Sequence, residues 1–159
     1  MNIFILNKDP MIAARQMCDR HVVKMLLETA QLLCSPYPAG EAPYKRTHYN
    51  HPCSKWIREG TANYWWLIQH GVALGAEYTW RYNKTHKSYE VISWSIDMFH
   101  TLDKLGIPQT EELTPFPQCM PEQYKIPNDP VQAYKNYYIG EKKKFAKWNK
   151  GRTQPAWFI

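Results

Sequence analysis

Six prolines lie between residues 107 and 130, and this density constrains the fold more than any other feature of the chain. Proline cannot donate a main-chain hydrogen bond, so it is excluded from helix interiors and from the inner strands of a sheet. We therefore expect residues 107–130 to form an ordered loop that drapes over helices and is anchored by Phe116, Met120 and Tyr124. Regular secondary structure must lie on either side of this loop.

On both sides of the loop, apolar residues recur at the spacing of a helix and not with the alternation of a strand. Asp9–Pro10 and Asp129–Pro130 are typical helix starts, because aspartate caps the first turn and proline suits the first helical position. The predicted helices cover residues 10–34, 61–82, 89–105 and 130–147, with a short helix capped by Ser54 before the second. This pattern predicts an all-α fold: a single compact domain, residues 1–159, of about four helices with long proline-rich loops.

Charge and composition narrow the class of partner. Lysine and arginine total 20 against 14 acidic residues, a formal charge of +6 that favours a polyanion such as DNA. No run of eighteen apolar residues is present, and the apolar stretch 3–6 is too short for a signal peptide, so we expect no membrane partner. The four cysteines match no zinc or CxxC spacing, which indicates free thiols in a reducing, cytoplasmic setting. We expect a monomer.

A basic, aromatic C-terminal segment, residues 141–159, is the first candidate surface for DNA. Residues 142–152 hold six cations and two rings, a mixture suited to phosphate contact and to stacking on an exposed base. The residues expected to contact DNA here are Lys143, Lys147, Trp148, Lys150, Arg152 and, in the tail, Trp157. A solvated helix face has the same composition, so that alternative stays open.

The first predicted helix carries the candidate chemistry. Met17, His21, Lys24, Glu28 and Gln31 fall on one line of that helix, flanked by apolar and small residues. Burial beside such a face would favour the neutral forms of the histidine and the glutamate and would mark a site. The alternative is a polar outer stripe held by an ion pair between the lysine and the glutamate.

A second polar cluster follows in a proline-flanked loop, residues 44–52, which contains His48, Asn50 and His51. With His21 and Glu28 these histidines are a conceivable metal set. The chain has neither an HExxH motif nor two histidines four residues apart on a helix, so we expect no metal and no cofactor.

The order of these motifs resembles the phage pyrimidine-dimer DNA glycosylases of the endonuclease V type, including phage-encoded relatives. In that family a short N-terminal arm precedes a helix with Asp-x-His and, seven residues after the histidine, a glutamate; here these residues are Asp19, His21 and Glu28. A lysine-rich segment that ends in Asn-His-Pro corresponds to residues 44–52, and a basic helix with a Pro-x-Trp-aromatic tail corresponds to residues 142–158. The resemblance touches both ends and the middle of the chain through short motifs.

The resemblance implies a DNA glycosylase, with or without AP-lyase activity, that acts on double-stranded DNA in the cytoplasm, that of the host cell for a phage protein. In such enzymes the N-terminal amine attacks the sugar C1′ and forms a Schiff base, and a carboxylate assists ring opening and strand cleavage. Here the amine would be that of Met1, retained because Asn2 is too large for its usual removal, with Glu28 as the carboxylate and His21 beside them. The DNA contacts expected around this site are Asn2, Lys24, Gln31, Lys45, Arg46, His48, Asn50 and His51.

The chain departs from the dimer-specific enzyme at three positions. Asn2, Leu27 and Gln31 stand where that enzyme has arginines, which weakens the expectation of dimer recognition and leaves another lesion or a modified base as substrate. Two alternatives remain: a base-modifying transferase that acts on hypermodified phage DNA with the same scaffold, and a non-catalytic phage factor that binds DNA or protein.

Overall fold

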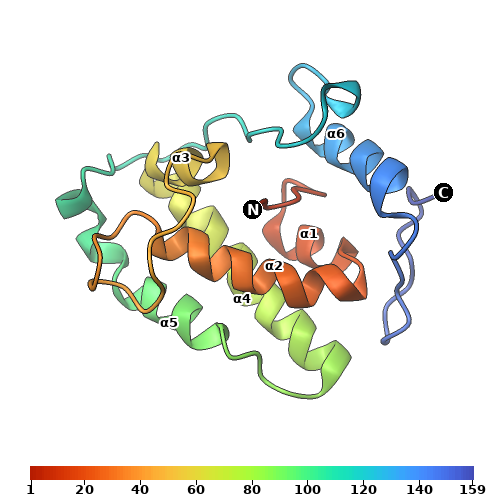
Figure 1. The fold of residues 1–159 in the computed structure, drawn as a ribbon, viewed down its shortest axis with the longest axis horizontal. Coiled ribbons are helices and arrows are strands. Elements are labelled where there is room, and N and C mark those ends of the chain that lie inside the picture. Colours follow the sequence, from red (N-terminus) through yellow and green to blue (C-terminus); the bar gives the residue numbers. More distant parts are fainter.

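The computed structural model describes residues 1–159, and its regular secondary structure is entirely helical (Figure 1). The α-helices are α1 (Pro10–Gln16), α2 (Asp19–Cys34), α3 (Pro52–Arg58), α4 (Thr61–Tyr82), α5 (Tyr89–Asp97) and α6 (Pro130–Tyr137). Two 3-10 segments, η1 (Phe99–Leu105) and η2 (Glu122–Tyr124), and a π-helical turn, η3 (Tyr138–Lys142), complete it. The all-α prediction is confirmed, with more and shorter helices than expected. None of them is both long and apolar enough to cross a bilayer.

The longest helix, α4, lies at the centre of the fold and has the predicted bounds. Helices α1, α2, α3 and α5 all pack against it (Figure 1). A glycine permits the closest approach: a Cβ on Gly71 would lie 2.8 Å from Ile92 of α5 and 3.2 Å from Thr29 of α2. Any larger residue there would push α2 and α5 away from α4.

The N-terminal arm packs into this core, as predicted. Ile3, Ile5 and Leu6 are fully buried, and the ring of Phe4 lies 4.6 Å from that of His21 on α2. Because apolar burial of this kind is the main stabilising term in folding, these side chains fix the arm in the core. Its first residue, Met1, lies beside α2, so the amino group is close to that helix.

The first predicted helix is not continuous. Met17 and Cys18 are extended between α1 and α2, so Met17 does not share the polar line of α2. The guanidinium of Arg81 on α4 donates to the carbonyls of Met17 and Arg15, at 2.7 and 2.9 Å. The hydroxyl of Tyr138 accepts from the main-chain N–H of Cys18 at 3.1 Å. Side chains distant in sequence thus replace the helical hydrogen bonds that are lost at the break. The main-chain groups there therefore avoid the free-energy cost of being buried without a partner.

Three other predicted helix boundaries were wrong. The helix predicted over residues 89–105 ends at Asp97 and continues as η1, and the last helix ends at Tyr137 with η3 after it instead of reaching residue 147. Helix α3 is capped by His51 and not by Ser54: the His51 Nδ1 accepts from the main-chain N–H of Cys53 at 3.1 Å. The capping residue is thus a member of the candidate loop.

The proline-rich loop is ordered, as expected, and crosses α3 and α4. The ring of Phe116 lies 5.1 Å from the rings of both Trp56 and Trp66, and the Trp56 indole donates to the Thr114 carbonyl at 3.2 Å. The loop then passes the N-terminal arm on its way to α6. Its course brings Cys119 to the start of α3 and beside Asn2.

Candidate active site

The amino group of Met1, in the N-terminal arm, lies close to the carboxylate of Glu28 on α2. The Met1 nitrogen lies 3.8 Å from Glu28 Oε2, and the main-chain N–H of Asn2 donates to the same oxygen at 2.9 Å. The Met1 side chain is only 2% exposed although the residue as a whole is half-buried, so solvent reaches mainly its backbone, which carries the amine. The predicted proximity is therefore present, at a distance too long for a direct hydrogen bond.

The other oxygen of Glu28 faces a cation. Lys24 Nζ lies 3.7 Å from Oε1, one helical turn away, and the lysine side chain is 65% exposed. An exposed lysine holds a carboxylate weakly, because water screens the pair. Glu28 thus has an ordered oxygen near the amine and a loosely paired oxygen toward solvent.

Asn2 holds the arm in this position. Its Oδ1 accepts from the main-chain N–H groups of Ile3 and Phe4 at 2.8 and 3.3 Å and from the Tyr134 hydroxyl at 2.9 Å. Its Nδ2 donates to the Cys119 carbonyl at 2.8 Å. Asn2, which was expected to contact DNA, is 8% exposed, and its amide group is hydrogen-bonded inside the protein. It acts as a positioning residue for the amine.

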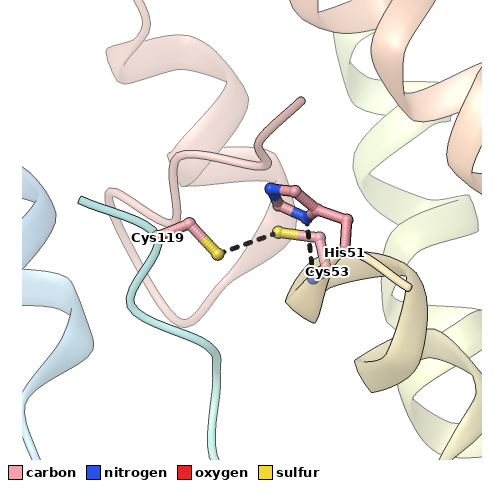
Figure 2. Close-up of side chains that lie close together, drawn as sticks. All are labelled: His51, Cys53 and Cys119. Carbon is pink, nitrogen blue, oxygen red and sulfur yellow. Dashed lines mark hydrogen bonds between the residues drawn. The ribbon is translucent and has the colours of Figure 1, made fainter. Parts of the chain in front are cut away.

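His51 and two cysteines, Cys53 and Cys119, form a cluster (Figure 2). The charge of the Met1 amine acts on His51 and Cys53. Burial lowers the pKa of His51, the charges of the Met1 amine and His48 lower it further, and Glu28 opposes the shift. The three side chains come from the start of α3 and from the proline-rich loop. His51 is the one histidine of the predicted set that the structure brings near both Met1 and Glu28.

The two thiols of the cluster, those of Cys53 and Cys119, lie 3.6 Å apart. Their hydrogen bond and the burial of Cys53 raise the pKa of Cys53, and the same hydrogen bond lowers the pKa of Cys119 to about 7. Either sulfur can donate in this contact. Sequence spacing could not indicate this pair, because 66 residues separate its members.

His21 occupies a different place from the one expected. Its Nδ1 shares a 2.8 Å hydrogen bond with the Tyr138 hydroxyl, and its ring packs between Phe4 and Phe145. Burial, together with the charges of Lys142, Lys24 and Arg20, lowers its pKa to about 3. No hydrogen bond joins it to Met1 or Glu28. The neutral His21 ring packs against Phe4 and so helps to hold the N-terminal arm in place.

An open groove of about 580 Å³ runs from α2 to the C-terminal segment. It is lined by Asp19, Arg20, Val23, Lys24, Tyr82, Phe145, Lys147, Asn149 and Lys150. Four of these residues are cationic and one is anionic, so the groove is strongly basic. Lys24 belongs both to the groove and to the Glu28 ion pair, which makes the groove continuous with the candidate site.

The C-terminal segment is less available to DNA than its composition suggested. Trp148 is 7% exposed, and both its indole and that of Trp157 donate to Gln16, at 3.1 and 3.2 Å. The expectation that Trp148 stacks on a base is wrong, because its ring is part of the core. Arg152 is bound to Glu77 at 2.7 Å, whereas Lys143, Lys147 and Lys150 remain exposed.

The loop of residues 44–52 lies beside the C-terminal half of α2, at Leu27 and Gln31. Arg46 donates to the Ser35 and Pro36 carbonyls at 2.9 and 2.7 Å, so this predicted DNA contact has a structural task. Lys45, His48 and Asn50 are exposed. Leu27 is 41% exposed and lines an open groove with Gln31, Tyr44, Lys45, Arg46 and Thr47. The loop thus supplies cations beside two of the positions that lack the family's arginines.

A buried ion network was absent from the prediction. Arg81, whose side chain is 0% exposed, lies 3.0 Å from Glu77 and 3.2 Å from Asp19, and Asp19 also accepts from the Asn149 N–H at 2.8 Å. Burial alone would raise the pKa of Glu77, but hydrogen bonds and charge from Arg152 and Arg81 lower it. Asp19, singled out from the family pattern, therefore anchors the C-terminal segment.

Comparison with known proteins identifies the family of the chain. The family model described as pyrimidine dimer DNA glycosylase matches residues 1–90, which is more than half of the chain. The matched span contains the arm, Glu28 and His51 and ends before the proline-rich loop. Neither the curated proteins nor the solved structures include a significant match. The chain belongs to the pyrimidine dimer DNA glycosylase family.

Proposed function

We propose that this protein excises a damaged or modified base from double-stranded DNA and cleaves the resulting abasic strand, with the Met1 amine as nucleophile and Glu28 as proton carrier. The observation that carries the proposal is the 3.8 Å separation of the amine from a buried carboxylate that the Asn2 N–H holds in place. General acid–base groups act over such distances once a substrate atom or a water enters between them.

The chemistry follows from these two groups. The neutral amine donates its lone pair to the sugar C1′, and the bond from C1′ to the base breaks, so that the base leaves with the electron pair and takes up a proton. Glu28 accepts the proton that the amine loses and returns it to the sugar ring oxygen as the ring opens to an imine. The imine makes the neighbouring C2′ proton acidic, and its removal expels the 3′ phosphate.

The charge distribution supports a DNA substrate. The basic groove adjoins Glu28 through Lys24, and Lys147 and Lys150 lie farther along it. Cations spaced along a groove can follow a phosphate backbone while the amine reaches a sugar. Lys45 and exposed polar groups of the loop beside the C-terminal half of α2 would contact the strand beyond the site. DNA contact on both flanks of Glu28 suits an enzyme that must open a duplex to reach C1′.

Borohydride trapping tests the mechanism. The protein is incubated with duplexes that carry a pyrimidine dimer, a modified pyrimidine or an abasic site, and borohydride reduces any imine to a stable adduct. We expect an adduct on the abasic duplex, because this substrate needs no base recognition, and on the duplex that carries the true substrate base. Peptide mapping of the adduct should locate it on Met1.

Two variants and their controls sharpen this test. Glu28→Gln keeps an oxygen that accepts from the Asn2 N–H and should retain the fold and DNA binding while losing cleavage. Glu90→Gln, at an exposed position on α5, is the matched control. A fixed Gly-Ser extension before Met1 should abolish trapping, and the same extension after Ile159 should not. An adduct on a lysine, or a fully active extended protein, would contradict the amine mechanism.

The trapping panel also separates the two alternatives. A base-modifying transferase would change a base without an adduct at any abasic site. A binding module would retain its affinity for DNA and give no product with any duplex.

A further inference from the structure

Near the candidate amine lies a cluster that the proposed reaction does not use, and its two cysteines are no part of the family pattern. His51, Cys53 and Cys119 offer one ligand atom each, and these atoms all lie within 4.8 Å of one another (Figure 2). Cys53 is fully buried, and His51 and Cys119 are partly exposed, so an ion could enter from solvent and still be enclosed. Two cysteines and a histidine are a usual ligand set for a zinc ion.

The spacing of the sulfurs matches a shared metal ion. Two zinc–sulfur bonds of about 2.3 Å at a tetrahedral angle span about 3.8 Å. The Cys53 and Cys119 sulfurs are 3.6 Å apart, whereas a disulfide needs about 2.05 Å. The two side chains would have to move little to bind one ion.

The backbone around the cluster is already fixed. The carbonyl of Cys119 accepts from Asn2 Nδ2 at 2.8 Å, and its N–H donates to the Tyr134 hydroxyl at 3.1 Å. Cys53 lies in the first turn of α3, one of the helices packed on α4. Ligands held in this way lose little conformational freedom when an ion binds, which favours binding.

We propose that His51, Cys53 and Cys119 bind a zinc ion that joins the proline-rich loop to α3 beside the Met1 amine. Three protein ligands leave a fourth position for water or another group, as in zinc sites that are not purely structural. The charges of Met1 and Glu28 both act on His51 and Cys53, so the cluster lies within electrostatic reach of the candidate site. The ion would hold the loop in the position from which Cys119 binds Asn2.

Binding requires one defined change at His51. Its Nδ1 now accepts from the Cys53 N–H. An ion bound at Nδ1 replaces that hydrogen bond, and an ion bound at Nε2 requires a proton on Nδ1, which also breaks it. In either case the Cys53 amide loses its acceptor. The Cys53 amide resonance should therefore shift strongly when the ion binds, and this signal is independent of DNA and of activity.

Cobalt titration of the full-length, reduced protein tests the proposal without any substrate. We expect one Co²⁺ per chain, with a thiolate-to-cobalt charge-transfer band in the near ultraviolet, the visible bands of a tetrahedral ion, and displacement of both by Zn²⁺. Zn²⁺ should also raise the thermal midpoint of the wild-type protein.

Cysteine variants locate the site. Cys119→Ser, at a partly exposed position where folding should survive, should remove the charge-transfer band and weaken binding by more than the roughly 10- to 100-fold that loss of an outer partner costs. Cys53→Ser should do the same, with circular dichroism as the check on folding. Cys34→Ala, which removes a buried thiol elsewhere, is the control and should bind as the wild type does.

Two outcomes would overturn the proposal. One is the absence of a charge-transfer band at stoichiometric Co²⁺ in protein whose thiols are shown to be free. The other is a band that survives in Cys119→Ser. Because none of these measurements uses DNA, failure of the zinc site would leave the amine mechanism standing, and failure of the amine mechanism would leave the zinc site standing.

Discussion

Glu28 and Glu77 are both buried glutamates on core helices, but their surroundings differ. Glu77 is bound directly by Arg81 at 3.0 Å and by Arg152 at 2.7 and 3.1 Å, so both of its oxygens are occupied by guanidinium groups. Glu28 has one short hydrogen bond, from the Asn2 N–H at 2.9 Å, and its cations remain at 3.7 and 3.8 Å. Of these two carboxylates, Glu28 accepts fewer hydrogen bonds, so its oxygens are more available to accept a proton during a reaction.

This difference separates a structural carboxylate from one suited to chemistry. Charge-assisted hydrogen bonds to arginine are the strong ones, and a carboxylate saturated by them gains nothing from a substrate. Glu28 instead lies at the edge of a basic groove, next to an amine that is not bound to it. The following predictions test this contrast, beginning with the largest expected effect.

Replacing Glu28 should affect activity far more than stability. Glu28→Gln should lower the rate of trapping and strand cleavage by about 100- to 10,000-fold, the range that general acid–base groups contribute. The free energy of unfolding should fall by less than about 1.5 kcal/mol, because the amide oxygen still accepts from the Asn2 N–H. Single-turnover assays and urea unfolding measure the two effects. A variant that cleaves at the wild-type rate would remove Glu28 from the chemistry.

Replacing Glu77 should do the reverse. Glu77→Gln leaves Arg81, whose side chain is 0% exposed, without its main counter-charge and should lower the free energy of unfolding by about 3–5 kcal/mol. Activity per folded molecule should be retained, since Glu77 lies away from the amine. Urea unfolding gives the first quantity, and activity corrected for the folded fraction gives the second. Glu90→Gln should change neither.

Stability should decline in mild acid because two buried histidines resist protonation. Burial lowers the pKa of His21 from 6.5 to about 3 and that of His70 to about 4. Between these values and 6.5 the unfolded chain binds more protons than the folded one, so the free energy of unfolding falls as the pH falls, by up to about 1.4 kcal/mol per pH unit for each histidine. Above about pH 6.5 both histidines are neutral in the folded and the unfolded chain, so the free energy of unfolding no longer depends on pH through them.

Unfolding in urea from pH 4.5 to 8 measures that slope, and His21→Phe should reduce it. His100→Gln, at an exposed position, is the matched control. An equal slope in His21→Phe and the wild type would show that His21 does not stay neutral.

The smallest effect should come from the groove cations. Replacing Lys147 and Lys150 by glutamine should weaken binding to all duplexes alike and reduce the slope of log K against log salt by about 0.9 for each lost phosphate contact. Lys87→Gln with Lys104→Gln, which removes two exposed lysines outside this groove, is the matched control. Filter binding at several salt concentrations measures both, and an unchanged salt slope in the groove variant would place the DNA elsewhere.

The features that the sequence predicted correctly are mostly local. Asp9 caps α1 by accepting from Met11 at 2.8 Å, two residues away, and α4 runs from Thr61 to Tyr82, as its apolar spacing predicted. The cap and the helix depend on residues that are close together in the chain. The proximity of Met1 to Glu28 was also predicted, but from the resemblance to the glycosylase family and not from local pattern.

What only the tertiary structure decided depends on partners far apart in sequence. The break at Met17 arises because Arg81, 64 residues later, binds its carbonyl. Trp148 was expected to face DNA but is buried, since its indole reaches Gln16. Cys53 and Cys119 meet because the loop between α5 and α6 crosses α3. Periodicity and capping reflect the energetics of neighbouring residues, whereas these contacts depend on how the helices pack, and packing is determined by the whole core at once.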